Sequence, residues 1–150
     1  MKKINNYRSI LIACGLVFLV FFSAVFYHKN KSNDIGKNKE VRLGDCVFDV
    51  ELAEDQEARK KGLSDRASIC KECGMLFIFQ EKGNFGFWMK DMLFDLDILW
   101  IRDGKVVEII RNISYNSRDV YQPKELIDMV LEINAQEAQG CKIEVGQELR

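Results

Sequence analysis

The chemistry easiest to recognise in the chain is that of four cysteines: Cys46, Cys70, Cys73 and Cys141. A redox-active Cys70-x-x-Cys73 pair needs a lowered thiolate pKa, usually from a helix N-terminus in a thioredoxin-like unit, and no such unit is evident. All four thiolates together could instead hold a zinc ion. In an exported domain, structural disulfides are the simplest outcome, either across the pair or from the pair to Cys46 or Cys141. A bridge from Cys46 to Cys141 would close a long loop and contribute roughly 4 to 5 kcal/mol to the stability of the fold, through the entropy it removes from the unfolded chain. We favour oxidised, structural cysteines.

Asp97 is a carboxylate in an apolar stretch, between Leu96 and Ile98. Burying an unpaired ionised carboxylate is very unfavourable, so we expect it to have a partner. Three cations from neighbouring segments could supply charge-assisted hydrogen bonds: Arg59, Arg66 and Lys90. The pair could fix the strand register, which is the interpretation we favour, or grip a ligand in a polar pocket. The enzymatic alternative is a hydrolase or lyase, with Asp97 as general acid or base and Lys90 or Arg66 as its electrostatic partner.

An aromatic and basic cluster precedes Asp97, at Phe87, Trp88, Met89 and Lys90. In a strand, alternate residues face opposite ways, so one pair of these side chains could simply be core, and we favour packing over ligand contact. If Trp88, Lys90 and Asp97 converge, the site would suit sugars or other small polar molecules, because stacking plus a carboxylate suits hydroxyl-rich rings. An exposed aromatic patch without a cavity would instead favour a protein partner.

Composition excludes several classes of enzyme and binding protein. The 150 residues carry 22 Lys and Arg against 23 Asp and Glu, a net charge of −1, without a recurrent basic stripe, so we predict no nucleic-acid binding. The single histidine, His28, lies beside an apolar segment, which excludes a Ser-His-Asp triad, an HExxH zinc site and a Cys-His pair in the folded part. No motif indicates a cofactor, and apart from the zinc alternative we predict no metal site.

The N-terminal stretch over residues 9–27 is apolar and carries no charge. As a helix it would be roughly 28 Å long, enough to span a bilayer. It is longer than the apolar part of a cleaved signal peptide and ends in bulky residues, which favours an uncleaved signal anchor. We therefore expect a cytoplasmic tail over 1–8, a single transmembrane helix over 9–27, a polar linker over 28–40 and an extracytoplasmic domain over 41–150 at the cell membrane.

Alternation and turn residues predict a series of short strands in residues 41–150. Apolar residues alternate with acidic ones over 47–52, as in a half-buried strand. Residues 54–61 run from acidic to basic and precede Gly62, as in a short helix. Further strands are expected at 75–79, 85–89, 96–101, 106–110, 129–133 and 141–149, the last with a turn at Gly146.

The firmest turn signal is Asp103-Gly104 between two β-rich runs, which predicts a hairpin. Residues 112–125 are polar, contain the only proline and are expected to form a loop. Asn134 followed by Glu137 resembles a capping box that would open a helical turn ending near Gly140. Since no connection has room for a full crossover helix, we predict a mainly β (α+β) domain, a compact β-sandwich or barrel-like fold with two short helices.

Six sequence blocks, in order, resemble those of the DUF192 (UPF0127) family. They are Glu51-Leu52-Ala53; Arg59-Lys60-Lys61-Gly62-Leu63 with Arg66; Gly74 to Phe79; Phe87 to Met92; Leu96 to Ile101; and Val130 to Ala135. The resemblance runs from about residue 46 to the C-terminus. It implies a compact, mostly β domain, often behind a signal or membrane segment, and it implies no activity. Gln136 stands where the family usually has Gly, and the loop from Cys70 to Cys73 is not part of the family pattern.

These features together predict a membrane-tethered, extracytoplasmic binding or accessory module rather than an enzyme. Its ligand would be a small polar molecule such as a sugar, and the candidate binding residues are Arg59, Arg66, Trp88, Lys90 and Asp97. The alternatives are the hydrolase or lyase built on Asp97, a thiol oxidoreductase using Cys70 and Cys73, and a module that contacts a protein partner.

Overall fold

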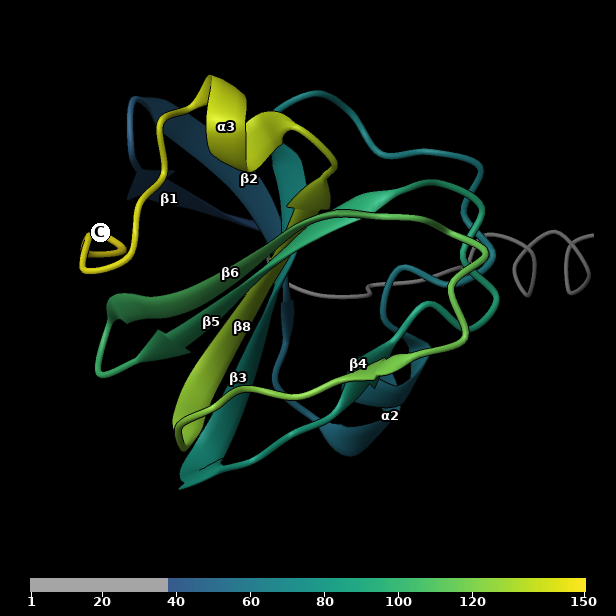
Figure 1. Ribbon diagram of the computed structural model, residues 1–150, viewed down its shortest axis with the longest axis horizontal. Coiled ribbons are helices and arrows are strands. Elements are labelled where there is room, and N and C mark those ends of the chain that lie inside the picture. Colours follow the sequence, from purple (N-terminus) through teal and green to yellow (C-terminus); the bar gives the residue numbers. More distant parts are fainter. Residues whose placement is uncertain (1–37) are drawn as a thin grey trace, which may run out of the picture. The chain divides into compact units, whose positions relative to one another are not determined.

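The structure, a computed structural model, describes residues 38–150, which form a mainly β domain (Figure 1). The elements of this part follow in the order β1 (Asn38–Leu43), β2 (Cys46–Ala53), α2 (Gln56–Lys61), β3 (Cys73–Gly83), β4 (Phe87–Trp88), β5 (Leu96–Arg102), β6 (Lys105–Ile113), β7 (Val120–Tyr121), β8 (Ile127–Asn134) and α3 (Glu137–Gly140). The predicted mainly β class with two short helices is confirmed.

The predictions for the N-terminal tail and the membrane helix over 9–27 concern residues outside the described part of the chain. Between residues 38 and 150, no helix has the length and apolar character needed to cross a membrane. β1 begins at Asn38, so residues 38–40 of the predicted linker belong to the folded domain.

Six strands form one sheet in the order β1-β2-β3-β8-β5-β6, while β4 pairs with β7 in a separate two-stranded sheet. All neighbours in the large sheet are antiparallel except β2 and β3, which are parallel. Residues 54–72 therefore form a crossover connection, although, as expected, they hold no full crossover helix. This segment returns the chain to the start of β3 with only a short helix, α2, and an irregular stretch.

Two local predictions are confirmed by backbone geometry. In the hairpin between β5 and β6, Asp103 and Gly104 have φ angles of 52° and 75°, as a tight two-residue turn requires. α2 begins after Asp55, whose carboxylate accepts a hydrogen bond of 2.7 Å from the N–H of Ala58. It ends at Gly62, which has a φ of 51° and donates its N–H to the carbonyl of Ala58. Both elements therefore follow from their local sequence.

The segments around β4 differ from the prediction. The strand expected at 85–89 is reduced to the two residues of β4, and its partner β7 lies inside the expected loop 112–125. These short strands form because two segments far apart in the sequence meet, which no local pattern shows.

The C-terminal segment also departs from prediction, because residues 141–149 do not form a strand. Its backbone instead makes hydrogen bonds at both edges of the large sheet. The N–H of Leu149 donates to the carbonyl of Gly104 at 2.8 Å, next to β6. Arg150 and Arg42 of β1 exchange two backbone hydrogen bonds of 2.6 and 3.0 Å. The segment thus links the beginning of β6 to β1.

The helical turn α3 is present, but the predicted capping box is wrong. Its N-cap residue is Gln136, which has a left-handed φ of 73° and no side-chain capping bond. The side chain of Asn134 donates to the carbonyl of Cys70 at 2.9 Å instead.

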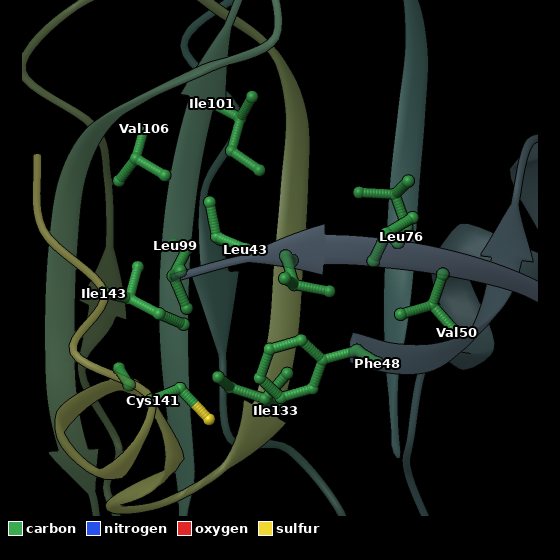
Figure 2. Packing of buried hydrophobic residues seen from close by; sticks show 13 residues of the cluster. Leu43, Phe48, Val50, Leu76, Leu99, Ile101, Val106, Ile133, Cys141 and Ile143 are labelled. Atoms are coloured by element: carbon green, nitrogen blue, oxygen red, sulfur yellow. The ribbon is translucent and has the colours of Figure 1, made fainter. Parts of the chain in front are cut away.

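The large sheet buries apolar residues on both faces. On the face that packs against α3 and the C-terminal segment, here called the α3 face, Leu99 and Ile101 of β5 join Phe48 and Ile143 (Figure 2). On the opposite face, here called the cleft face, the alternate residues of β5 pack with Leu63 and Met89. Each face therefore has its own hydrophobic core.

Candidate functional site

A cleft of about 460 Å³ opens on the cleft face of the sheet. Residues of β3 and β8 contribute to it, together with α2 and the turn after it, and the segment that contains β4. Four basic and five aromatic residues line the cleft, but only one acidic residue does, Glu132. Aromatic surface combined with a few polar groups in one concavity is typical of small-molecule sites.

Glu132 is only 6% exposed, although its side chain belongs to the lining of the cleft. It lies on β8, directly opposite Met75 of β3 and Ile98 of β5. Since residues opposite each other in adjacent strands point to the same face, apolar side chains flank the carboxyl group on both sides. Within residues 38–150 this carboxyl forms no hydrogen bond or ion pair, and burial raises its pKa to about 8. Glu132 is therefore mainly protonated at neutral pH.

The basic residues of the cleft carry positive charge that nearby carboxylates leave largely unneutralised. Lys61 pairs with Asp65. The other three, Arg59, Lys60 and Lys90, form no ion pair with any residue in the described part of the chain. The lining of the cleft thus includes three basic residues without ion pairs and one neutral acid.

Aromatic rings position two of these cations. The guanidinium of Arg59 lies 5.3 Å from the centroid of the Phe79 ring and donates a hydrogen bond of 3.0 Å to the carbonyl of Ile78. The ammonium of Lys90 lies 5.6 Å from the centroid of the Trp88 ring. Both distances are within the range of cation–π attraction, so each cation is held close to an aromatic surface.

The aromatic residues form a connected group that reaches from the cleft into the core. Phe79 and Phe85 are stacked with their centroids 3.6 Å apart, and Phe87 meets Phe77 edge to face at 4.9 Å. Phe87 also contacts the buried Trp100, with 5.3 Å between centroids. The indole Nε1 of Trp100 is buried and has no hydrogen-bond partner among the described residues. The cleft face thus contains one fully buried polar atom without a partner, this indole nitrogen, and one mostly buried carboxyl group without a hydrogen bond, that of Glu132.

The structure brings together three of the five predicted binding residues. Arg59, Trp88 and Lys90 line the cleft. Asp97 and Arg66 do not line it. Trp88 is 60% exposed, so its ring is available at the cleft instead of being buried in a core.

Asp97 is fully buried among the residues of the α3 face, and the expected cationic partner is absent from its hydrogen bonds. One carboxylate oxygen accepts a hydrogen bond of 2.7 Å from the N–H of Asn112, and the other accepts one of 2.9 Å from the N–H of Ala138. Both partners are backbone amides, which satisfy the carboxylate without a second buried charge. Asp97 therefore joins β5 to β6 and to α3.

Arg66 is engaged with a carboxylate outside the cleft. Its guanidinium forms a bidentate pair with Glu51 of β2, and this hydrogen-bonded partner raises the pKa of Arg66. The pair fixes the segment after α2 against the sheet.

Sequence reasoning missed Glu132, although the signal was present. Leu131-Glu132-Ile133 has the same pattern as Leu96-Asp97-Ile98, one acid between two apolar strand residues. The pattern marks both acids as buried, but the sequence does not show which one faces backbone amides and which faces a cleft.

The cysteines of the described domain form two pairs. Cys46 is bonded to Cys141, with Cα atoms 5.4 Å apart, and Cys70 to Cys73, with Cα atoms 5.2 Å apart. The four sulfurs therefore do not form the zinc site considered above, and residues 38–150 contain no cluster of three metal-binding side chains. No helix begins at the Cys70 pair in this part of the chain, so the usual means of lowering a thiolate pKa is missing there.

Comparison with known proteins shows which structures share the fold of this domain and which family the chain matches. A crystal structure from Sinorhizobium meliloti, described as that of a candidate transcription regulator, is 30% identical, with a TM-score of 0.76, and the match covers 79% of this chain and 97% of that one. A protein of unknown function from Novosphingobium aromaticivorans is 26% identical, with a TM-score of 0.74, over 79% of this chain and 89% of that one. No curated protein matches significantly. Residues 39–150 match the family model DUF192, described as "Uncharacterized ACR", and the chain therefore belongs to the DUF192 family.

Proposed function

We propose that the domain is a binding module and that its cleft holds a small, polar, ring-shaped molecule. The observation that carries the proposal is Glu132, a carboxyl group buried between Met75 and Ile98 without a partner and turned toward the cleft. A buried polar group without a hydrogen bond costs stability. Such a group in a cleft is typical of functional sites, where a ligand supplies the missing partner.

The walls of the cleft suit a ring. Trp88 and the stacked pair of Phe79 and Phe85 offer flat apolar surfaces, while Lys90 and Arg59 lie within reach of those surfaces. A molecule with a flat face and polar groups at its edge could stack on the rings and bond to the polar side chains. Sugars and small aromatic compounds with polar substituents both have this character.

Methyl NMR of the full chain labelled with ¹³C-methyl methionine tests the proposal, because the methionines report on both faces of the sheet. Met92 lines the cleft and Met75 lies opposite Glu132, whereas Met129 packs on the α3 face. We expect members of a panel of monosaccharides and small substituted benzenes to shift the Met92 and Met75 resonances and to leave Met129 unchanged. If no compound at millimolar concentration produces this selective shift, the proposal is wrong.

A matched pair of variants checks that the responding site is the cleft. Trp88 and Tyr115 are both exposed aromatic residues, 60% and 49% respectively, and only Trp88 lines the cleft. Trp88→Ala should weaken any binding detected by NMR at least several-fold, whereas Tyr115→Ala should leave it unchanged. An equal loss in both variants would place the binding elsewhere.

An enzymatic role, if one exists, would use Glu132 rather than Asp97. Both oxygens of Asp97 are bound to backbone amides, whereas the carboxyl of Glu132 lines the cleft and keeps its proton at neutral pH. A carboxylic acid with a pKa near 8 is suited to general acid catalysis. Chemical conversion of a bound compound, lost in Glu132→Gln while binding is kept, would favour this second candidate.

We also propose that the domain works outside the cytoplasm, tethered by the apolar stretch over residues 9–27. The two cysteine pairs support an oxidising compartment. Residues 38–150 carry 16 Lys and Arg against 22 Asp and Glu, which disfavours a nucleic-acid role like that suggested for the relative from Sinorhizobium meliloti. A membrane-impermeant amine reagent applied to intact spheroplasts should label the domain and spare a cytoplasmic marker. Labelling only after lysis would contradict the tethered, exported arrangement.

A further inference from the structure

We infer that the ligand of the cleft is an anion, a small carboxylic acid carried on a ring, whose carboxylate lies among Lys90, Lys60 and Arg59. The inference rests on the proposed binding function and adds the charge of the ligand to it. It excludes neutral sugars and amines as the preferred occupants.

The distribution of charge carries the inference. Residues 38–150 have an excess of six acidic residues, yet the only acid that lines the cleft is Glu132. Nine of the 16 basic residues of this part of the chain form ion pairs with carboxylates. Three of the seven remaining basic residues line this one cleft, namely Arg59, Lys60 and Lys90. A negatively charged domain that places three of its seven unpaired basic residues in a single concavity offers a site for an anion.

The protonation of Glu132 supports the same conclusion. An ionised carboxylate in the cleft would repel an anion, but burial between Met75 and Ile98 keeps the Glu132 carboxyl neutral. A neutral carboxyl donates a hydrogen bond, so Glu132 can bind an oxygen of a carboxylate ligand whose charge the basic residues of the cleft balance. The aromatic residues Trp88 and Phe79, each beside one of the cations, explain why the acid should carry a ring.

Two series of compounds that differ only in charge provide the test. The first is glucuronate, glucose and glucosamine, and the second is benzoate, benzamide and benzylamine. Titration of the full chain, followed through the Met92 methyl resonance, should show the acid binding at least tenfold more tightly than the neutral and the cationic compound of the same ring. Equal or tighter binding of the neutral compound would overturn the inference and leave the proposed binding function intact. Absence of a Met92 response to every compound would instead overturn both.

A pair of variants with the same change of charge locates the effect. Lys90→Gln should weaken binding of the acid about fivefold or more and change binding of the neutral compound less than twofold. Lys39 is exposed, forms no ion pair within residues 38–150 and lies outside the cleft, so Lys39→Gln is the control. Equal weakening by both substitutions would show that only the total charge of the protein matters, which contradicts a built anion site.

Discussion

The carboxylate of Asp97 in β5 accepts a hydrogen bond of 2.9 Å from the backbone N–H of Ala138, the second residue of α3 and 41 positions further along the chain. The N-cap residue of this helix, Gln136, makes no capping bond of its own. The first turn of α3 is therefore capped by a distant strand residue. This contact couples the helix to the large sheet.

Asp97→Ala should destabilise the domain strongly. The substitution leaves the buried N–H of Ala138 and the N–H of Asn112 without their acceptor, and hydrogen bonds to charged groups contribute about 1.5 to 3 kcal/mol each. We expect the free energy of unfolding, measured by urea denaturation, to fall by about 3 kcal/mol or more. Asp119→Ala, at an exposed loop position, is the control and should change it by less than about 0.5 kcal/mol. Native-like stability of Asp97→Ala would contradict the capping role.

Gln136→Gly should stabilise the domain. Gln136 has a φ of 73°, and the left-handed conformation costs a residue with a side chain roughly 1 to 2 kcal/mol. Glycine removes this cost but loses more entropy on folding, so we expect a net gain of about 1 kcal/mol or slightly less in thermal or urea unfolding. Gln136→Ala keeps the unfavourable conformation and should show no such gain. A less stable glycine variant would show that the glutamine side chain has a stabilising contact.

Glu132 should make stability depend on pH in a defined direction. Its pKa is about 8 in the folded domain, against an ordinary value of 4.5, so between these values the unfolded chain binds fewer protons than the folded one. Stability contributed by Glu132 therefore falls as pH rises from 4.5 to 8, by up to about 1.4 kcal/mol per pH unit, and levels off above pH 8. Glu132→Gln removes the titration, so the variant should gain stability relative to the native protein as pH rises through this interval. A difference in stability that does not change with pH would contradict the raised pKa.

Binding of an acidic ligand should depend on the same proton. The side chains facing Glu132 from β3 and β5 are apolar, and the charged groups that share its cleft are Arg59, Lys60 and Lys61 from α2 and Lys90 after β4. Glu132 loses its proton near pH 8 and then repels an anion. Affinity for benzoate or glucuronate should fall between pH 7 and 9 in the native protein and stay constant in Glu132→Gln. The same fall in both proteins would assign the effect to another group.

The two cysteine pairs should differ greatly in their effect on stability. Cys46 and Cys141 are separated by 95 residues in the sequence and Cys70 and Cys73 by three, and the entropy that a cross-link removes from the unfolded chain grows with the loop it closes. Replacing Cys46 and Cys141 by Ser should lower the free energy of unfolding by about 4 to 5 kcal/mol. Replacing Cys70 and Cys73 should lower it by less than half as much. Equal losses would show that strain or contacts, and not loop closure, determine the contribution of these bonds.

Local sequence was sufficient for elements whose boundaries depend on their own residues. Asp103-Gly104 fixed the hairpin of β5 and β6, and Asp55 and Gly62 fixed the ends of α2. Elements that need a distant partner were not predictable in the same way. The strands β4 and β7 exist only through each other, and β1 begins with polar, exposed residues that resemble a linker.

The candidate site was predictable in part for the same reason. The sequence identifies acids that must be buried, Asp97 and Glu132, and side chains suited to a ligand, Trp88 and Lys90. Which acid shares a face with those side chains depends on the order of β8 and β5 in the sheet and on the pleat of each strand. That arrangement follows from long-range pairing, so the sequence pointed to Asp97, and not to Glu132, as the candidate acid of the site.

The C-terminal segment has a consequence for how the protein behaves in solution. An uncovered edge of a β-sheet presents free N–H and C=O groups that can recruit a strand from another molecule. The backbone of Arg150 forms hydrogen bonds with the N–H and C=O of Arg42 on β1. The carbonyl of Gln147 accepts a hydrogen bond from the N–H of Val106 near the start of β6. Removing the last four residues would expose the same positions at both edges together, and the shortened protein should self-associate through strand addition.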